Sequence, residues 1–394
     1  MGAFFFAGFG TFALIYDVQP LLAEFPQEFG VSPATASLAL SLTTLALSVS
    51  MLVMGRVSER VDRRRLMSGA IVVAGVVSVV SAFAPAWECF LILRALVGVA
   101  LGGLPAVALA YLADNVPHGR LAAAVGLYVS GTAFGGMSGR LIGGVVAGEL
   151  GWRYTVWIIG VLCMVAGVVF FVALPKRERR RVGVVEEGEM ALRGLLGRFV
   201  AQWKDSVLRR LFVVGGVLMG CFVANFNYLC FLLRGEAFGF SQGGVSLVFL
   251  MYFAGVVVSP SCGWLVGRFG RKTVLRGAFL LIATGALLGV AGAGGGTGAL
   301  WFLIGGSILV TIGFFAGHAT AGAWVNRQTD SGKAIASAQY LTVYYIGASL
   351  LGWAGGWAWQ WWGWIGVAML VGTGALAGVC LVPREDAASG GGRG

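Results

Sequence analysis

The chain has 394 residues, of which 58% are hydrophobic and only 11% are charged, and its formal net charge is +11. A soluble domain cannot bury that share of apolar surface, so the composition excludes a soluble globular protein and predicts an all-α membrane protein. The six cysteines lie in apolar segments without CxxC spacing, which indicates packed core residues, and we expect no metal or other cofactor.

Twelve apolar segments are long enough to cross a bilayer as helices. We place them at residues 4–25, 35–54, 67–86, 89–113, 121–147, 152–174, 211–233, 243–266, 277–295, 298–322, 333–358 and 362–382. The first segment lacks a basic n-region and a small-residue cleavage site, so it is interpreted as a retained helix rather than a signal peptide. The charged stretch 175–210 predicts a linker between two six-helix bundles, residues 1–174 and 211–394.

Positive charge is distributed unevenly between the two sides of the membrane. With a cytoplasmic N-terminus, the inside loops and the C-terminal tail hold 24 of the 28 Lys and Arg residues, whereas the outside loops hold only Arg153 and Arg234. Such a bias sets the topology of membrane proteins, so we expect both termini and the linker to be cytoplasmic. The basic runs are therefore interpreted as topology determinants, and we expect no nucleic-acid partner.

Two loops at corresponding places in the two halves carry related sequences. Residues 55–65 follow the second segment and residues 263–272 follow the end of the eighth, and their first glycines, Gly55 and Gly263, are 208 positions apart. Both loops resemble the signature of the major facilitator superfamily, G-x-x-x-(D/E)-R-x-G-R-(R/K), although Asp62 replaces a glycine of the family pattern and Gly267 replaces its acid. A parallel repeat of this kind is one route to a transporter whose substrate site lies between the halves.

Further motifs extend the resemblance over the whole chain. Arg94 and Gly98 in the fourth segment are similar to the family's R-x-x-x-G motif. The fifth segment is similar to the antiporter motif G-x-x-x-G-P-x-x-G-G, with Gly136 in place of the proline and Arg140 added. The closest similarity is to the YnfM-like group of bacterial drug:proton antiporter-type transporters, and it is carried by residues 16–22, 131–144, 314–325 and 340–347. The resemblance implies the twelve-helix fold of that family.

The resemblance also implies roles for the loops and for the glycines. In the family the signature loop is a cytoplasmic gate that locks the outward-facing state, and the corresponding residues here are Gly55, Glu59, Arg60, Arg63, Arg64, Asp114, Gly263, Arg268, Gly270 and Arg271. The loop arginines can bind helix-end carbonyls and Asp114, the acid at the cytoplasmic end of the fourth segment. The alternative to a gate is that the loop serves only topology and packing. The helix-packing glycines are Gly98, Gly102, Gly131, Gly135, Gly139 and Gly143. They predict close approach of a neighbouring backbone, either as a seam that hinges the cavity or as packing alone.

Asp17 is the only acidic residue well inside a membrane-length segment. A charge in the hydrocarbon costs about 2.5–3.5 kcal/mol on insertion scales, so it is rarely retained for packing alone. The other two intramembrane charges are Arg94 and Arg140. Their distances from the segment ends place all three charges at similar depth, in the outer half of the first bundle.

Two interpretations of Asp17 stay open. In the first, Asp17 forms a static ion pair with Arg94 or Arg140 that holds helices together. In the second, Asp17 gains and loses a proton; burial favours its neutral form, an adjacent arginine favours its charged form, and the amino-acid pattern does not decide between them. Because two arginines face one acid, a positive charge is left over that can hold an anionic group of a substrate.

The second half supplies neutral polar groups to the candidate substrate site. Together with Tyr16, Gln19, Arg94 and Arg140, the substrate-binding candidates are Asn225, Asn227, Tyr228, His318, Gln339, Tyr340 and Tyr344. The 208-residue offset aligns Asn225 with Asp17, so we expect these two to face each other. Tyr340 and Tyr344 are one helical turn apart and share a face, and His318 is a candidate second titrating group. Packing is the alternative for each of them.

These observations predict a proton-coupled secondary transporter of the bacterial inner membrane that exports a small organic molecule by alternating access. The alternative is a uniporter or proton symporter of an organic anion. The absence of nucleophile–base, HExxH and nucleotide-binding motifs argues against an enzyme or an ATP-driven pump. A non-transporting receptor would show no solute flux. We expect a monomer whose partners are its substrate, protons and lipid.

Overall fold

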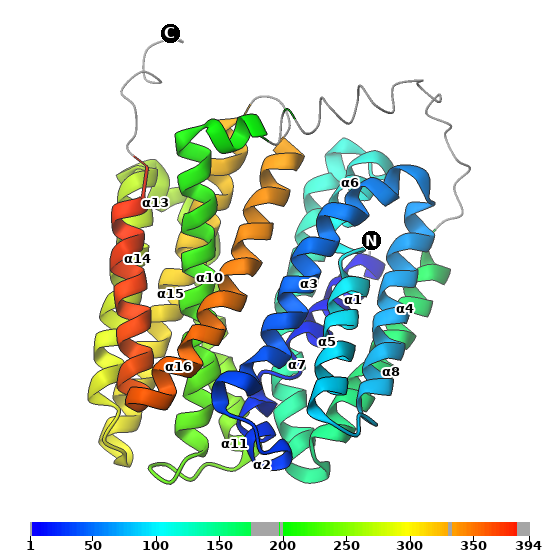
Figure 1. Cartoon of the computed structure of the whole chain (residues 1–394). Coiled ribbons are helices and arrows are strands. Elements are labelled where there is room, and N and C mark those ends of the chain that lie inside the picture. Colours follow the sequence, from blue (N-terminus) through cyan, green and yellow to red (C-terminus); the bar gives the residue numbers. More distant parts are fainter. Residues whose placement is uncertain (1, 175–196, 198–199, 330–332, 384–394) are drawn as a thin grey trace.

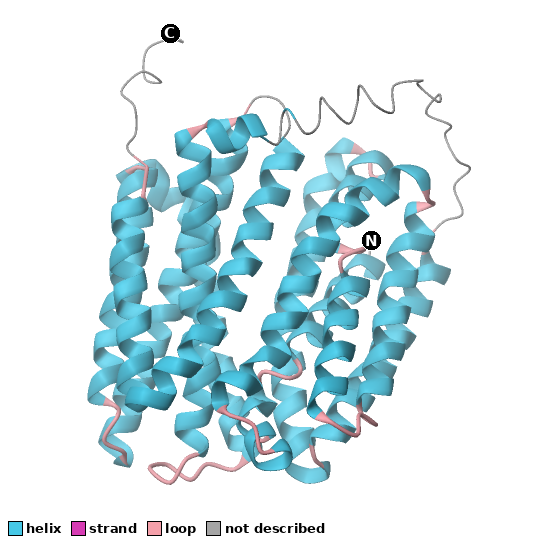
Figure 2. Ribbon diagram, in the orientation of Figure 1, coloured by secondary structure: helices cyan, strands magenta, loops and turns pink. Residues whose placement is uncertain are grey.

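The structure is a computed structural model that describes residues 2–174, 197, 200–329 and 333–383. All regular structure in these residues is helical (Figure 2). The helices form two groups that lie side by side (Figure 1), called here the first half and the second half. The all-α membrane fold expected from composition is confirmed.

The first half extends to residue 174. Its α-helices and its 3₁₀ helix (η1) are α1 (Gly2–Tyr16), η1 (Pro20–Ala23), α2 (Phe25–Phe29), α3 (Pro33–Arg60), α4 (Arg63–Ser81), α5 (Trp87–Leu101), α6 (Pro105–Asn115), α7 (His118–Leu150) and α8 (Trp152–Ala173). Helix α1 packs against α7 and α8, α3 packs against α5, and α4 packs against α5 and α8.

The second half follows the linker. Its elements are α10 (Ser206–Arg234), α11 (Gln242–Ser246), η2 (Leu247–Met251), α12 (Tyr252–Val258), η3 (Ser259–Ser261), α13 (Cys262–Phe269), α14 (Arg271–Ala291), α15 (Gly296–Gln328) and α16 (Lys333–Leu381). Helix α10 packs against α16 and α15, and α14 packs against α15 and α16. The end of the molecule where α8 ends and α10 begins is called the linker end, and the opposite end is called the far end.

Backbone breaks interrupt three of the twelve expected segments, so the expectation of a continuous helix is wrong there. The segment 4–25 is helical only to Tyr16, after which a turn leads into η1 at Pro20. The segment 89–113 breaks between α5 and α6, and Pro105 begins the second piece. The segment 243–266 is divided among α11, η2, α12, η3 and α13. Proline lacks the backbone N–H that would continue a preceding helix, which accounts for the first two breaks.

The last two expected segments are joined in α16, which bends at Gly363. The φ of Gly363 is +56°, a left-handed value that glycine adopts at least cost. Within the described residues, nine helical segments are long and apolar enough to cross a membrane by length and composition. The other expected crossings correspond to α5 with α6, to α7, and to the part of α16 after Gly363.

Helix α7 lies against α1 with almost no space between their backbones. A Cβ atom built on Gly131, Gly135 or Gly139 would overlap the backbone of α1 at Phe5, Phe9 and Ala13, respectively. Gly143, one turn further, faces the carbonyl oxygen of Asp17, to which a Cβ would come within 2.8 Å. The expected close approach of a neighbouring backbone is therefore confirmed, and it positions the end of α1 that carries Asp17.

The two halves contact each other toward the far end. Gly144 of α7 faces the side chain of Ser246 in α11, and Gly356 of α16 faces the backbone of Ala34 in α3. The side chain of Ser349 in α16 donates a hydrogen bond of 2.8 Å to the carbonyl of Ser41 in α3. Helix α11 also contacts α7 and η1 of the first half. The far end is therefore where the halves are held together.

Candidate functional site

Asp17 and Arg94 form a buried ion pair. The distance from Arg94 Nη2 to Asp17 Oδ1 is 3.2 Å, and both side chains are 0% exposed. Asp17 is the first residue after α1, so the break in the helix carries the acid, while Arg94 projects from α5. Neither carboxylate oxygen has a hydrogen-bond partner within the described residues. Asp17 is therefore held by the attraction of one arginine.

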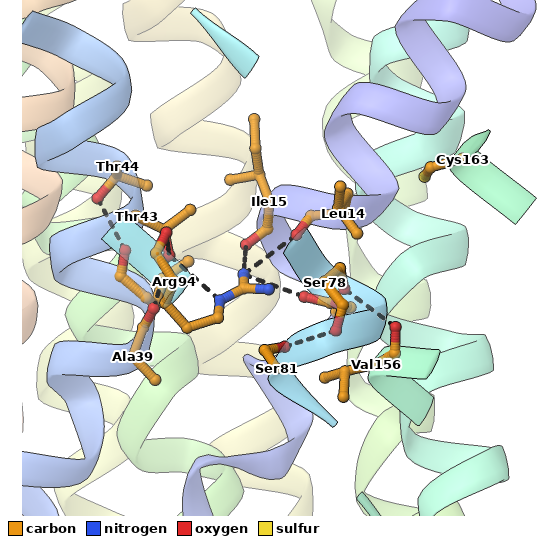
Figure 3. Close-up of polar contacts among 12 residues, drawn as sticks. Leu14, Ile15, Ala39, Thr43, Thr44, Ser78, Ser81, Arg94, Val156 and Cys163 are labelled. Atoms are coloured by element: carbon orange, nitrogen blue, oxygen red, sulfur yellow. Dashed lines mark hydrogen bonds and ion pairs between the residues drawn. The ribbon is translucent and has the colours of Figure 1, made fainter. Parts of the chain in front are cut away.

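Arg94 also binds the end of α1. Its Nη2 donates to the carbonyl oxygens of Leu14 at 3.1 Å and Ile15 at 3.3 Å, and its Nε donates to Thr43 Oγ1 at 3.3 Å (Figure 3). The last carbonyls of a helix lack partners within the helix and carry partial negative charge, so a guanidinium is favourable there. Arg94 thus stabilises both the C-terminal end of α1 and the carboxylate that follows it.

Arg140 was expected at the same depth as Asp17 and Arg94, but its contacts are with other residues. Its side chain is 2% exposed, and it donates to Gln19 Oε1 and to the carbonyl oxygen of Gly136. Its guanidinium carbon lies 3.8 Å from the ring centre of Tyr16 and 4.8 Å from that of Tyr252. No ion pair of Arg140 is found in the part of the chain that the structure describes. Of the two arginines expected as partners of Asp17, Arg94 is the one that pairs with it.

A hydrogen bond connects the two halves at this site. Gln19 Nε2 donates to Asn227 Oδ1 at 2.7 Å, and the two residues are 208 positions apart, the offset of the repeated loops. Asn225 does not face Asp17 as expected, because its Nδ2 donates to Ser307 Oγ of α15 at 3.2 Å. Residues two positions apart on a helix point to different sides, so only one of the two asparagines can face the first half.

The polar groups of α15 and α16 meet in an aromatic cluster. His318 Nδ1 lies 3.0 Å from the hydroxyl of Tyr340, and its ring centre is 4.9 Å from that of Tyr344. The ring centres of Tyr340 and Tyr344 are 6.3 Å apart, which confirms that they share a face. Phe314 extends the cluster, with its ring stacked at 4.1 Å on Phe222. His318 is thus hydrogen-bonded and surrounded by rings, and its role in titration stays a prediction.

Two further candidates lie apart from Arg140. The hydroxyl of Tyr228 donates to the carbonyl of Gly352 at 2.8 Å, and its ring stacks with Phe231 and Trp359. Gln339 Nε2 donates to Gln202 Oε1 at 2.9 Å, at the segment that precedes α10. The contacts of both side chains therefore favour helix packing over contact with a substrate.

The first signature loop is held within the first half. Arg63 Nη1 donates to Asp114 Oδ2 at 2.5 Å, which confirms the expected contact with the acid at the end of the fourth segment. Arg64 donates to the carbonyl of Phe171 and lies over its ring, so it joins the start of α4 to the end of α8. A Cβ on Gly55 would meet no atom within 4 Å. The side chains of Glu59 and Arg60 lie outside the described part of the structure.

The departure of the first loop from the family pattern has a local explanation. Asp62 caps α4, since its Oδ1 accepts a hydrogen bond of 2.9 Å from the backbone N–H of Arg64, and its φ is −58°. Gly270, at the 208-residue offset, has a φ of +80° at the start of α14. The second loop therefore needs glycine at this position, whereas the first accommodates a capping acid.

In the second loop the arginines lie on aromatic rings. Arg268 lies 5.6 Å from the ring centres of both Trp264 and Phe269, and Arg271 lies 4.9 Å from that of Trp324. A Cβ on Gly263 would meet no atom within 4 Å. These contacts fix the ends of α13 and α14, and a gating role for this loop stays a prediction.

Sequence reasoning missed Glu24, a partly buried acid just after η1 at the far end. Burial raises the pKa of its carboxyl from the ordinary value of 4.5 to about 7, Arg234 acts in the opposite direction, and Glu28 adds to the rise. The folded chain therefore holds this proton up to about pH 7, while the unfolded chain releases it near its ordinary pKa of 4.5. The free energy of unfolding should accordingly fall as the pH rises between these two values.

We expect the Glu24→Gln substitution to remove this loss of stability. Its melting temperature should exceed that of the unmodified protein at about pH 8 and approach it at about pH 5. Thermal unfolding of the purified protein at the two pH values measures the difference, and the exposed Glu149→Gln provides the control. An unchanged pH dependence of the melting temperature in Glu24→Gln contradicts the prediction.

Sequence reasoning also missed Tyr252 and Phe249, the second-half rings beside Arg140. They lie at the junction between η2 and α12, and no charge, repeat or spacing marks them among the many aromatic residues of the chain.

The chain is similar to known transporters over nearly its full length. The profile of the Major Facilitator Superfamily matches residues 1–350. The uncharacterized MFS-type transporter YybF of Bacillus subtilis is 38% identical over 369 residues, with 94% of this chain and 89% of YybF covered. The inner membrane transport protein YnfM of Escherichia coli is 36% identical over 369 residues, covering 94% of this chain and 86% of YnfM.

Solved structures show the same fold at much lower sequence identity. The nucleoside transporter NupG has a TM-score of 0.74 at 14% identity, with 97% of this chain and 99% of NupG covered. A bacterial homologue of the human lysosomal transporter Spinster, in an inward-facing and unoccupied conformation, also has a TM-score of 0.74 at 14% identity, with coverage of 96% and 93%. The resemblance seen in the sequence motifs is confirmed.

Proposed function

We propose that this chain, which belongs to the major facilitator superfamily of membrane transporters, exports a small organic molecule in exchange for protons. It is a multi-pass membrane protein and a transporter rather than an enzyme. Export, proton coupling and the nature of the substrate are the proposed parts.

The buried pair of Asp17 and Arg94 is the observation that carries the proposed proton coupling. A buried acid whose charged partner is a single arginine changes its charge when that ion pair lengthens, because burial then favours its neutral form. In the proposed cycle, Asp17 is charged and paired in the state described here and takes up a proton in the other facing state. A static pair that only holds α1 against α5 is the competing interpretation.

The proposed conformational change is a rocking of residues 1–174 against residues 211–394. The positive-charge bias supports a cytoplasmic linker end, so the contacts at the far end would close the site to the outside. Four side-chain hydrogen bonds between the halves support this assignment, and they involve Gln19 with Asn227, Thr44 with Ser349, Ser349 with Ser41 and Gln242 with Pro20. The loop held by Arg63 and Asp114 would act as the cytoplasmic gate.

Import of an organic anion is the second candidate function. Arg140, a buried positive charge without an acidic partner among the described residues, favours it. Reversing the pH gradient across liposomes distinguishes the two directions, because an exporter driven by inward protons and a proton symporter respond oppositely to the same gradient.

Substitution of Asp17 tests the proton coupling. We expect Asp17→Asn to abolish proton movement evoked by substrate while leaving exchange of substrate for substrate, since the variant still binds substrate but cannot change its charge. The measurement uses proteoliposomes loaded with a pH-sensitive dye and challenged with a panel of organic anions and cations under an imposed pH gradient. Glu28→Gln, which changes an exposed acid at the far end, is the matched control.

Normal gradient-driven pumping by Asp17→Asn contradicts the coupling role of this residue. Equal loss of pumping and exchange, in protein that is folded by size-exclusion chromatography, favours the static pair instead.

A further inference from the structure

Arg140 is a buried positive charge that no acidic residue neutralises in the described parts of the chain. Its side chain is 2% exposed at the junction of the halves. The ion pairs within the described residues belong to other arginines, and Asp17, the one acid at similar depth, is paired with Arg94. Burying a cation away from water is unfavourable unless an opposite charge accompanies it. The site therefore carries net positive charge when no substrate is bound.

The groups that touch Arg140 are neutral. Two oxygen acceptors, on Gln19 and Gly136, bind its N–H groups. Three rings surround the guanidinium, with centres 3.8 Å away for Tyr16, 4.8 Å for Tyr252 and 5.4 Å for Phe249. Ring faces attract a cation but do not cancel its charge. An anion completes the neutralisation, whereas an organic cation is repelled.

Arg140 also fixes the direction of the neighbouring amides. A guanidinium only donates hydrogen bonds, so the Gln19 atom that meets it is the oxygen, and the Gln19 nitrogen then donates to Asn227 Oδ1. Asn227 Nδ2 is left as a buried donor without a hydrogen-bond partner, and the buried hydroxyl of Tyr252 also has none in the described structure. Of these two groups, the Tyr252 hydroxyl belongs to a ring that faces Arg140, so it can donate to the oxygen of a ligand bound there.

A wall of aromatic rings continues from this charge into the second half. The ring centre of Tyr252 is 4.9 Å from that of Phe222, which stacks at 4.1 Å on Phe314, which in turn stacks at 5.8 Å on His318. Flat apolar molecules pack favourably against such rings. Arg140 and the wall of rings are adjacent. A ligand with an anionic group attached to a ring could therefore pair with Arg140 and pack against the wall at the same time.

From this arrangement we infer that the substrate is a small organic anion with an aromatic body, whose carboxylate or sulfonate group binds Arg140. The inference rests on the proposed transport function and narrows its substrate class. Gln19 and Arg140 from the first half and Phe249 and Tyr252 from the second half form the site, so the ligand bridges the two halves.

The test compares three probes that share one ring and differ in charge: benzoate, benzamide and benzylammonium. The full-length protein is purified in an uncharged detergent, and binding is measured as the shift in melting temperature and by calorimetry. We expect benzoate, and more strongly 1-naphthoate because of its larger ring, to stabilise the protein. Benzamide and benzylammonium should not. No shift with either carboxylate, or an equal shift with benzylammonium, overturns the inference.

Two substitutions locate the anion at Arg140. Arg140→Gln should weaken binding of the carboxylates by about tenfold or more, because it removes the charge that pairs with them. Gln19→Glu places a carboxylate against Arg140 without changing the side-chain length, so it should raise the melting temperature of the free protein and abolish the benzoate shift. This second variant keeps the test decisive if Arg140→Gln does not fold.

The control is Arg153→Gln, which removes a partly exposed arginine at the far end and should leave the benzoate shift intact. A benzoate shift that survives both Arg140→Gln and Gln19→Glu overturns the inference. These binding experiments need no gradient, so they are independent of proton coupling. Carboxylate binding without proton-coupled flux refutes the proposed coupling alone, and proton-coupled flux of organic cations refutes the anion assignment alone.

Discussion

Arg94→Gln is expected to lower the free energy of unfolding by about 3–5 kcal/mol, because it leaves the buried carboxylate of Asp17 without its partner. The substitution also removes the donor that binds the carbonyls of Leu14 and Ile15 at the end of α1. Thermal and denaturant unfolding of the purified protein in detergent measure the loss.

The double variant Asp17→Asn with Arg94→Gln separates the two contributions. It contains no buried charge at this site, so it should be more stable than Arg94→Gln alone, though less stable than the unmodified protein, because the carbonyls still lack their donor. Arg63→Gln is the control, since its pair with Asp114 is partly exposed and should contribute only about 0–1 kcal/mol. If Arg94→Gln costs no more than Arg63→Gln, the buried pair does not stabilise the fold.

Gly135→Val is expected to lower the free energy of unfolding by about 3 kcal/mol or to prevent assembly. The added side chain would overlap the backbone of Phe9 in α1, and a backbone segment cannot rotate away as a side chain can. Helix α1 would have to move off α7, which would also displace the turn that carries Asp17. Thermal stability of the purified variant and its yield from membranes report the effect.

Gly126→Val, on the same helix, is the matched control. A Cβ on Gly126 would meet no atom within 4 Å, so the same change in helix propensity occurs there without a clash. Similar losses of stability at Gly126 and Gly135 would contradict the prediction, because they would show that the contact between α1 and α7 does not require glycine at position 135.

Composition was sufficient to predict an all-α membrane fold, and the four-residue glycine spacing was sufficient to predict close packing of α7. The contact of Arg63 with Asp114 also followed from the loop motif. These features depend on composition and on spacing along one helix. The breaks after Tyr16 and Leu101 did not follow, because hydropathy averages over a window and does not register a few residues of non-helical backbone.

The sequence identified the residues of the candidate site, but it did not predict which of them contact each other. Depth along a helix follows from counting residues, so Asp17, Arg94 and Arg140 were expected near one level. Which arginine meets the acid depends on how each helix is rotated about its axis, and the pattern of apolar residues on these nearly uniformly apolar helices does not specify that rotation. The same uncertainty explains why Asn225 was expected where Asn227 is found.

The break after α1 has a mechanical consequence for the position of Asp17. Two residues just beyond Asp17 are tethered to the opposite half, Gln19 through Asn227 and the carbonyl of Pro20 through Gln242. In the proposed rocking motion, separation of the halves at the far end would move the non-helical residues around Asp17 before it moved helix α1. A displacement of one half would thereby change the backbone torsion angles at Asp17 and reorient its carboxylate.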